Sequence, residues 1–373
     1  MKVRMLDLAA QHEALEPELS RRVREMMHSG KFILGPAVAS FERAAAGYLG
    51  VQHAIGASSG SDALVLALLA LELGPGDEVL TTPFSFFATV ESILRVGATP
   101  RFVDVERETL ALDLAALEAA ITPRTRAILA VHLYGYPGDL ARLRELANRH
   151  RVTLIEDTAQ AFGARFASRA AGTFGDLGCF SFQPSKPLGA MGDAGLVVTN
   201  DEELAARCRQ LVVHGATRKH HHVHVSGNYR LDTLQAVILE QKLASFPRYL
   251  AERAERARVY DAGLAGLPGL ECPHAIENSE PSYALYTVRV LEAKRDALVR
   301  HLSSVGIETA VHYPEPLHRQ PALLTRGLGA EVGTLPVAER AAKEVLSLPL
   351  YPELPFDQLR SVVEAVREFC RSA

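Results

Sequence analysis

The stretch DLARLRELANRHRVTLIEDT, residues 139–158, contains the two patterns that decide the fold. Its first part, to His150, repeats apolar residues at helical spacing and carries charges on the other face, which predicts an amphipathic helix. The following VTLIEDT is short and mostly apolar and ends at Asp157, which predicts a buried strand. Helices that lead into buried strands are the units of α/β proteins.

The same alternation extends toward the N-terminus. Helical spacing recurs at residues 61–73, 88–97 and 114–121, and strand-like segments lie at 78–84, 99–105 and 127–135. Strands that are apolar on both sides and separated by helices indicate a mostly parallel sheet covered by helices on both faces.

The C-terminal third has a different pattern. A long helix at 232–246 and a charged segment at 248–264 are followed by a strand-like segment at 285–291, a helix at 294–306 and a last helix at 356–370. We therefore predict an α/β fold with a large α/β domain over residues 1–248 and a smaller α+β domain over residues 249–373.

Composition excludes several classes of function. The 373 residues carry a formal net charge of -4, which offers no general attraction to nucleic acid or to an anionic membrane. No apolar run approaches the roughly 20 residues that cross a bilayer, and the first residues turn polar too soon for a signal peptide. We expect a cytoplasmic protein. The four cysteines are far apart and lack C-x-x-C spacing, so reduced thiols are expected.

A histidine-rich stretch, RKHHHVHV at residues 218–225, raises the question of a metal site. Alternation in a hairpin would place His220, His222 and His224 on one face. No cysteine or carboxylate joins them locally, so we predict that no metal is bound.

The stretch CFSFQPSKPLGAMGDAG, residues 179–195, places Lys186 among small and apolar residues. An ammonium group is costly to bury, and enclosure can lower the pKa of a lysine and make its amine a nucleophile. The alternative is a lysine that extends its ammonium to solvent from a turn after a strand.

Other notable groups follow the predicted strands, at the edge where open α/β sheets bind ligands. Gly60 and Ser61 begin a helix, where free N–H groups and the helix dipole can hold a phosphate, although Ser61 could simply cap that helix. Asp157 ends a strand, three residues before Gln160, and could likewise be a helix cap. Phe86 follows another strand and could belong to the core.

Together these groups fit one cofactor, pyridoxal phosphate. It needs a lysine for its aldehyde, a carboxylate to keep its ring nitrogen protonated, an aromatic ring against its own ring, and donors for its phosphate. Lys186, Asp157 and Phe86 would fill the first three roles, and Ser181, five residues before the lysine, would join Gly60 and Ser61 at the phosphate.

Five segments also resemble those of a known family. FILGPAVASFE, SSGSDAL, IEDTAQAFGA, GCFSFQPSKPLGAMGDAG and GNYRLDTLQA resemble the signature segments of the pyridoxal-phosphate-dependent nucleotide-sugar aminotransferases of the DegT/StrS type, which have fold type I. The resemblance runs from near Leu6 to beyond Tyr313. It implies that Lys186 forms the internal aldimine and shuttles protons, that Asp157 pairs with the ring nitrogen, and that Gln160 contacts the ring hydroxyl. It also implies the following contacts: Phe86 stacks on the ring, and Gly60, Ser61 and Ser181 hold the phosphate.

The resemblance has further implications. Asn228, in GNYRLD, resembles an asparagine that the neighbouring subunit contributes to the phosphate, which implies a homodimer with two shared sites. The amino donor would be glutamate. Three departures are mild: Ser61 replaces a usual threonine, Gln183 an aromatic or histidine, and Ala194 a glycine.

The segment ETAVHYPEPLHRQPAL, residues 308–323, bears on the substrate. It resembles members that aminate carbon 3 of a keto sugar, most closely UDP-2-acetamido-2-deoxy-3-oxo-glucuronate, a precursor of cell-surface polysaccharides such as the O-antigen of lipopolysaccharide. His312 and Tyr313 would then lie at the sugar pocket, and His318 and Arg319 would add donors for an anionic ligand. The other reading is a proline-rich surface loop. A dTDP-3-keto-6-deoxyhexose is the alternative substrate, and a non-catalytic regulator or structural protein is the alternative of another class.

Overall fold

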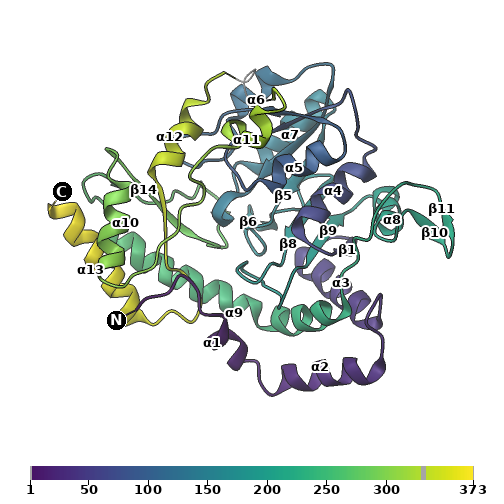
Figure 1. Ribbon diagram of the computed structural model, residues 1–373, viewed down its shortest axis with the longest axis horizontal. Helices are drawn as coiled ribbons and strands as arrows, with labels where there is room; N and C mark the ends of the chain where they lie inside the picture. The colour runs from purple at the N-terminus through teal and green to yellow at the C-terminus, as the bar shows by residue number, and fades with distance from the viewer. Residues whose placement is uncertain (1, 329–332, 373) are drawn as a thin grey trace.

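The computed structural model describes residues 2–328 and 333–372, and Figure 1 shows an α/β body joined to a smaller unit that contains both chain ends. A seven-stranded sheet has the order β1-β9-β8-β5-β4-β2-β3. Only β9 runs antiparallel to its neighbours, so the predicted, mostly parallel sheet is confirmed. The strands are β1 (His53–Ala57), β2 (Glu78–Thr81), β3 (Thr99–Phe102), β4 (Thr125–Val131), β5 (Thr153–Asp157), β8 (Leu177–Ser181) and β9 (Gly195–Thr199).

Helices cover both faces of this sheet. One face packs against α4 (Gly60–Ala70), α5 (Ala88–Arg95) and α8 (Glu202–Leu211). The other packs against α3 (Pro36–Leu49), α6 (Leu114–Ala120), α7 (Leu140–His150) and the first half of α9 (Thr233–Leu264). Successive side chains alternate, so Ile155 joins the α4 side and Leu154 the α7 side. By the same alternation, Asp157 lies on the α5 side of the strand end.

The long helix α9 corrects one expectation. The sequence predicts a helix over 232–246 followed by a charged segment at 248–264, but the two form one helix with Pro247 inside it. Phe246 and Tyr249, on either side of the proline, are both buried, and packing of both halves outweighs the hydrogen bond that proline cannot donate. The predicted domain boundary at 248/249 falls inside α9, which runs along both parts of the molecule in Figure 1, and the division stays a prediction.

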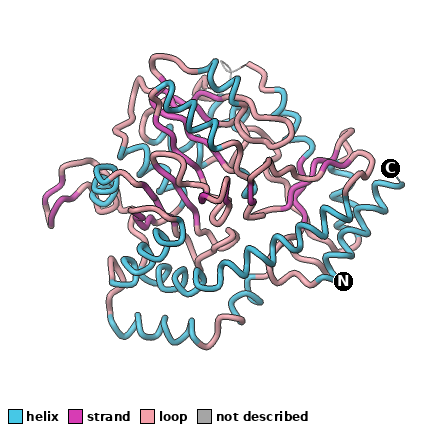
Figure 2. Tube along the Cα trace, turned by 180° about the vertical axis from the view of Figure 1, so that it is seen from behind, coloured by secondary structure: helices cyan, strands magenta, loops and turns pink. Residues whose placement is uncertain are grey.

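The smaller unit is built on an antiparallel sheet in the order β12-β14-β15. Its strands are β12 (Leu270–Glu271), β14 (Tyr286–Val290) and β15 (Val345–Leu348), and it packs against α10 (Arg295–Ser304), α13 (Phe356–Ser372) and the second half of α9. The start of the chain joins it, because Val3 forms a parallel bridge with Ile307 and Leu6 packs against the same core. Figure 2 shows the two ends of the chain on this side of the molecule.

Of the remaining elements, α2 (Glu18–Ser29) packs against α9 through Leu19 and Ile238. The others are short or peripheral: α1 (Leu8–Glu13), α11 (Pro321–Leu324), α12 (Pro336–Glu344), η1 (Leu133–Gly135), η2 (Leu317–Arg319), β6 (Arg165–Phe166), β7 (Arg169–Ala170), β10 (Ala216–Arg218), β11 (His221–His222) and β13 (Ser279–Glu280). No helix in the described ranges is long and apolar enough to cross a membrane.

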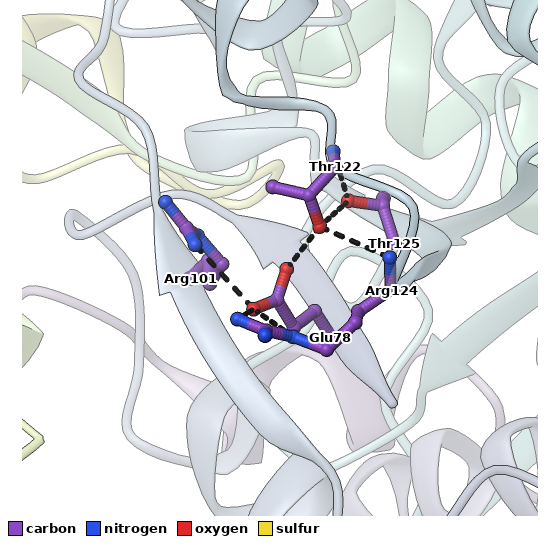
Figure 3. A network of polar contacts seen from close by, with 5 residues as sticks. All are labelled: Glu78, Arg101, Thr122, Arg124 and Thr125. Carbon is purple, nitrogen blue, oxygen red and sulfur yellow. Dashed lines mark hydrogen bonds and ion pairs between the residues drawn. The ribbon is translucent and has the colours of Figure 1, made fainter. Parts of the chain in front are cut away.

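A polar network holds the amino-terminal ends of three neighbouring strands (Figure 3). Glu78, at the start of β2, accepts hydrogen bonds from Arg124 at 2.6 Å and from Thr122 at 2.6 Å, and pairs with Arg101 at 3.4 Å. The carboxylate is only 5% exposed, so these contacts satisfy a group that would be costly to bury alone. The carboxyl ends of the parallel strands lie at the opposite edge of the sheet, beside a cavity.

Candidate active site

A cavity of about 590 Å³ lies at the carboxyl ends of the parallel strands. The structure brings together there nine of the residues predicted for the site: Gly60, Ser61, Phe86, Asp157, Gln160, Ser181, Lys186, His312 and Tyr313. Asn228, His318 and Arg319 do not line this cavity. Residues from the sheet edge form one side, and residues of the smaller unit form the other.

Lys186 lies in the loop between β8 and β9. Its backbone N–H donates to the Gln183 carbonyl at 2.8 Å, and a Cβ added to Gly189 would lie 2.4 Å from the Pro184 oxygen, so the loop turns sharply. Burial lowers the pKa of the Lys186 amine, while the nearby Asp157 acts in the opposite direction. The amine has no hydrogen bond or ion pair within the described chain, which fits an enclosed nucleophile better than a lysine extended to solvent.

Asp157 is 4% exposed at the end of β5. One carboxylate oxygen accepts from the Thr89 hydroxyl at 2.8 Å, and the other accepts from the Ala159 N–H at 3.2 Å. No helix begins here, so the helix-cap reading is wrong. Burial raises the pKa of Asp157, and the two hydrogen bonds only partly offset this. A cationic ring nitrogen is the partner that would stabilise its charged form.

The preceding carboxylate, Glu156, points to the other face of the sheet. It is fully buried and accepts from the His132 ring at 2.8 Å and from the N–H groups of Gly172 and Gly175 at 2.8 Å and 2.6 Å. Burial acts to raise the pKa of Glu156, but these hydrogen bonds outweigh it and hold the pKa below its ordinary value. The Glu156 carboxylate is thus held by donors within the protein, whereas the adjacent Asp157 carboxylate faces the cavity.

The N-terminus of α4 forms one end of the cavity. Ser59, and not Ser61, is the N-cap, because its hydroxyl accepts from the Asp62 N–H at 3.0 Å. The N–H groups of Gly60 and Ser61 have no partner within the helix and carry its positive dipole end. A Cβ on Gly60 would lie 2.5 Å from the Cβ of Ser181, so only glycine permits this close approach. The result is a cradle suited to a phosphate.

Aromatic and amide groups form the middle of the cavity. Phe86 is 58% exposed, so the core-packing reading is wrong, and its ring centroid lies 6.0 Å from that of Tyr313. The Gln160 side chain accepts from the Tyr134 N–H at 2.6 Å and donates to the Tyr313 hydroxyl at 3.2 Å. These bonds fix the orientation of the Gln160 amide at the wall of the cavity.

Only two of the four side chains predicted as donors in the segment 308–323 lie at the cavity. His312 and Tyr313 line the cavity, and the His312 ring lies 3.0 Å from the Ser347 hydroxyl. His318 and Arg319 do not line it, because both bind Glu339 of α12, at 3.0 Å and 2.9 Å. The predicted set of four donors is therefore reduced to two.

The histidine-rich stretch lies away from the cavity in the hairpin β10–β11. The second strand covers only His221–His222, so the expected alternation over His220, His222 and His224 does not extend along it. No group of three or more potential metal ligands occurs in residues 2–328 or 333–372. Asn228 is exposed just after this hairpin and forms a bridge with Val213.

Several lining residues were missed by sequence reasoning. They are Ser59, Ser85, Thr89, Ser185, Asp193 and Arg253. Ser59 carries the usual signal of an N-cap residue, but Arg253 lies in a charged helical segment that gives no local sign of a site. With these additions, the amine, the carboxylate, the exposed aromatic ring and the helix N-terminus fit pyridoxal phosphate.

Comparison with known proteins agrees with this chemistry. Relatives include a pleiotropic regulatory protein of Geobacillus stearothermophilus (46% identity, covering 100% of this chain and 99% of that protein) and a dTDP-3-amino-3,4,6-trideoxy-alpha-D-glucose transaminase of Streptomyces venezuelae (44%; 99% and 96%). A UDP-2-acetamido-2-deoxy-3-oxo-D-glucuronate aminotransferase of Pseudomonas aeruginosa is 40% identical (98% and 99%). The resemblance to the uronate enzymes is thus not stronger, by identity, than that to the dTDP-sugar enzyme.

Solved structures agree with the fold. DesV of S. venezuelae, in complex with a ketimine intermediate, superposes with a TM-score of 0.95 at 44% identity, covering 99% of this chain and 98% of that one. NtdA of Bacillus subtilis, with bound PMP, has a TM-score of 0.91 at 32% identity (99% and 85%). Residues 13–367 match the DegT/DnrJ/EryC1/StrS aminotransferase family. The chain therefore belongs to this family and is a pyridoxal-phosphate-dependent sugar aminotransferase.

Proposed function

We propose that this protein transfers an amino group, from glutamate, to carbon 3 of a keto nucleotide sugar used to build cell-surface polysaccharides. The observation that carries the proposal is the meeting of Lys186, Asp157 and the α4 N-terminus in one cavity. The names of the two transaminases similar at 44% and 40% support position 3, since one refers to a 3-amino and the other to a 3-oxo sugar.

Pyridoxal phosphate, when bound, supplies an aldehyde that condenses with amines and a ring that takes up the electron pair left by a departing proton. Lys186 is the group that takes and returns this proton, because burial favours its neutral, basic form. Asp157 would keep a proton on the ring nitrogen by its negative charge, and Thr89 orients the carboxylate. Gly60, Ser61 and Ser181 would hold the phosphate, and Phe86 and Gln160 would hold the ring and its hydroxyl, since all five line the cavity.

Two substrates remain candidates. We place UDP-2-acetamido-2-deoxy-3-oxo-glucuronate first, because His312 and Tyr313 offer polar contacts on the wall of the cavity and the segment around them resembles the uronate enzymes. The dTDP-3-keto-6-deoxyhexoses come second, supported by the S. venezuelae relative.

A direct comparison of substrates tests this order. We expect the UDP-linked uronate to be preferred over any dTDP-3-keto-6-deoxyhexose by at least roughly a hundredfold in kcat/KM, about 2.7 kcal/mol of transition-state discrimination. A site that hydrogen-bonds a carboxylate loses much more by its absence than an apolar pocket loses from a methylene. Both keto sugars are assayed with glutamate and the products identified by mass spectrometry. Equal efficiency, or preference for the deoxy sugar, would make the dTDP-3-keto-6-deoxyhexose the better-supported substrate. The proposal of amino transfer would still hold.

A non-catalytic role is the competing proposal, because one relative is named as a pleiotropic regulatory protein. The joint presence of Lys186, Asp157 and Gln160 in the cavity favours catalysis, because a scaffold needs none of their chemistry. Visible absorbance of the purified protein, and its bleaching by glutamate, separate an active site from an inert fold.

We also propose a homodimer with shared sites. Asn228 is exposed and does not line the cavity of its own chain, and Phe32, Ile33 and Leu34 form an apolar run that is 52%, 48% and 54% exposed. An exposed apolar run of this kind is typical of a contact surface. We propose that a second copy covers this run and that its Asn228 reaches the phosphate cradle of the first copy.

Subunit mixing tests the dimer. Asn228→Ala should weaken cofactor binding, and Lys186→Ala should be inactive, yet a mixture of the two variants should regain activity. In each mixed dimer one site carries both defects and the other carries neither, if the two residues come from different chains. Mixed populations are made by refolding together and assayed against each variant alone. A mixture no more active than the sum of its parts would show that Asn228 serves its own chain.

A further inference from the structure

Arg253, on the second half of α9, is the one buried guanidinium that reaches the cavity. It is 2% exposed, and apart from Lys186 it is the only lysine or arginine among the described residues that line the cavity. One terminal nitrogen, Nη1, donates to the backbone carbonyls of Tyr283 and Leu350, both at 3.1 Å. These two bonds fix the orientation of the guanidinium.

The rest of this guanidinium has no protein partner. Its Nε is buried without a hydrogen bond, its Nη2 makes none, and no carboxylate lies within ion-pair distance in the part of the chain that the structure describes. Burial lowers the pKa of Arg253 to about 10, and the negative charge of Glu353 acts against this without forming an ion pair. A buried cation with unused donors is costly unless a ligand supplies the opposite charge.

The surroundings of Arg253 indicate which class of ligand it would bind. The lining of the cavity includes the apolar residues Met5, Leu6, Leu285 and Leu350, and none of its carboxylates forms an ion pair with Arg253 in the described part of the chain. The phosphate cradle at the α4 N-terminus is formed by other residues, so the cofactor phosphate does not need this cation. A planar guanidinium with a free edge is the side chain best matched to a carboxylate.

We propose that Arg253 binds a carboxylate of the amino donor, so that the amine of the donor is directed toward the end of the cavity occupied by Lys186. This inference rests on the proposed function. The same chemistry would be offered by the carboxylate of a uronate sugar, which enters the cavity in the other half of the reaction. The experiment therefore measures the two half-reactions separately.

The control variant is a neighbour on the same helix. Arg256 is also buried, at 8% exposed, and donates to the Leu354 and Glu252 carbonyls, at 2.8 Å and 3.0 Å. It stacks over the Phe356 ring at 4.8 Å and does not line the cavity. Arg256→Gln thus removes a structural guanidinium, whereas Arg253→Gln removes in addition the proposed carboxylate contact.

Single-turnover kinetics of the holoenzyme with glutamate provide the test. Arg253→Gln should raise the apparent Kd for glutamate about 30-fold or more while the limiting rate changes by less than about threefold. Arg253→Lys should be intermediate, because it keeps the charge without the fork of donors. Inhibition by glutarate, which has no amine, should weaken in parallel. Arg256→Gln should leave both glutamate and glutarate binding unchanged, and melting curves confirm that each variant is folded.

The outcomes separate the two proposals. If Arg253→Gln and Arg256→Gln have equal affinities for glutamate, the carboxylate subsite is overturned while amino transfer stands. If Arg253→Gln weakens only the uronate half-reaction, the guanidinium serves the sugar and the donor assignment is also overturned. If the unmodified protein reacts with no amino acid, the proposed function itself fails.

Discussion

Replacement of Lys186 by alanine is expected to reduce amino transfer by roughly three orders of magnitude or more. The variant loses both the amine that attaches the cofactor and the group that moves the proton, and no other lysine lines the cavity in the described structure. Cofactor should still bind noncovalently, because the cradle at Gly60 and Ser61 and the Phe86 ring are unchanged. Borohydride reduction followed by peptide mass spectrometry should attach the cofactor to Lys186 in the unmodified protein only.

Lys242 is the matched control for this result. It is 1% exposed, and burial lowers its pKa to about 8, so it shares the altered basicity of an enclosed lysine. It lies outside the cavity, and its amine has no hydrogen-bond partner among the described residues. Lys242→Met should keep amino transfer within about threefold of the unmodified rate. Substantial turnover by Lys186→Ala, or covalent cofactor found on Lys242, would reject the assignment of the nucleophile.

The second large effect is expected for Asp157→Asn, which should slow proton removal from the donor by several orders of magnitude. The amide has nearly the same shape and keeps the contact with Thr89, so the fold and the cavity should survive. What is lost is the negative charge that keeps the ring nitrogen protonated. Stopped-flow measurement of the glutamate half-reaction, with and without deuterium at the α-carbon, isolates this step.

Glu156→Gln supplies the control, since this carboxylate is adjacent and equally buried but faces away from the cavity. Its three hydrogen bonds come from His132, Gly172 and Gly175. The variant should lose about 1 to 3 kcal/mol of unfolding free energy while its half-reaction rate stays within about threefold. A near-normal rate in Asp157→Asn, or equal slowing in both variants, would mean that charge at the ring nitrogen is not the property that matters.

The parts of the site that sequence reasoning found are those encoded locally. Asp157 follows a strand whose pattern is plain, and Lys186 sits in a stretch of unusual composition, so both were placed before the fold was seen. His318 and Arg319 were misplaced because the residue that binds them, Glu339, comes about twenty positions later and has no local mark. Arg253 was missed for a similar reason, since only the packing of α9 beneath residues 283 and 350 turns it toward the cavity.

Long-range packing also determines which side chains are exposed and where helices end, and local sequence patterns do not reveal it. Phe86 follows a buried strand and reads as a core residue until the structure leaves a space in front of it. The helix predicted over 232–246 stops before Pro247 because proline is a local signal, whereas the buried side chains that continue the helix beyond it contact distant parts of the chain. Pattern and composition therefore predicted the sheet and the cofactor-facing edge. Of the wall that the smaller unit contributes, only His312 and Tyr313 were predicted, and these from the resemblance.

That wall also determines the order in which the site is completed on the ribosome. Val3 pairs with Ile307, and Met5 and Leu6 line the cavity, so these three residues find their neighbours only after the segment around Ile307 has been synthesised. At a translation rate of about 5 to 20 residues per second, that takes about 15 to 60 s. During that interval the sheet edge, with Lys186 and the phosphate cradle, can already fold while the opposite wall is absent. The nascent chain is thus open to its cofactor before the cavity closes around it.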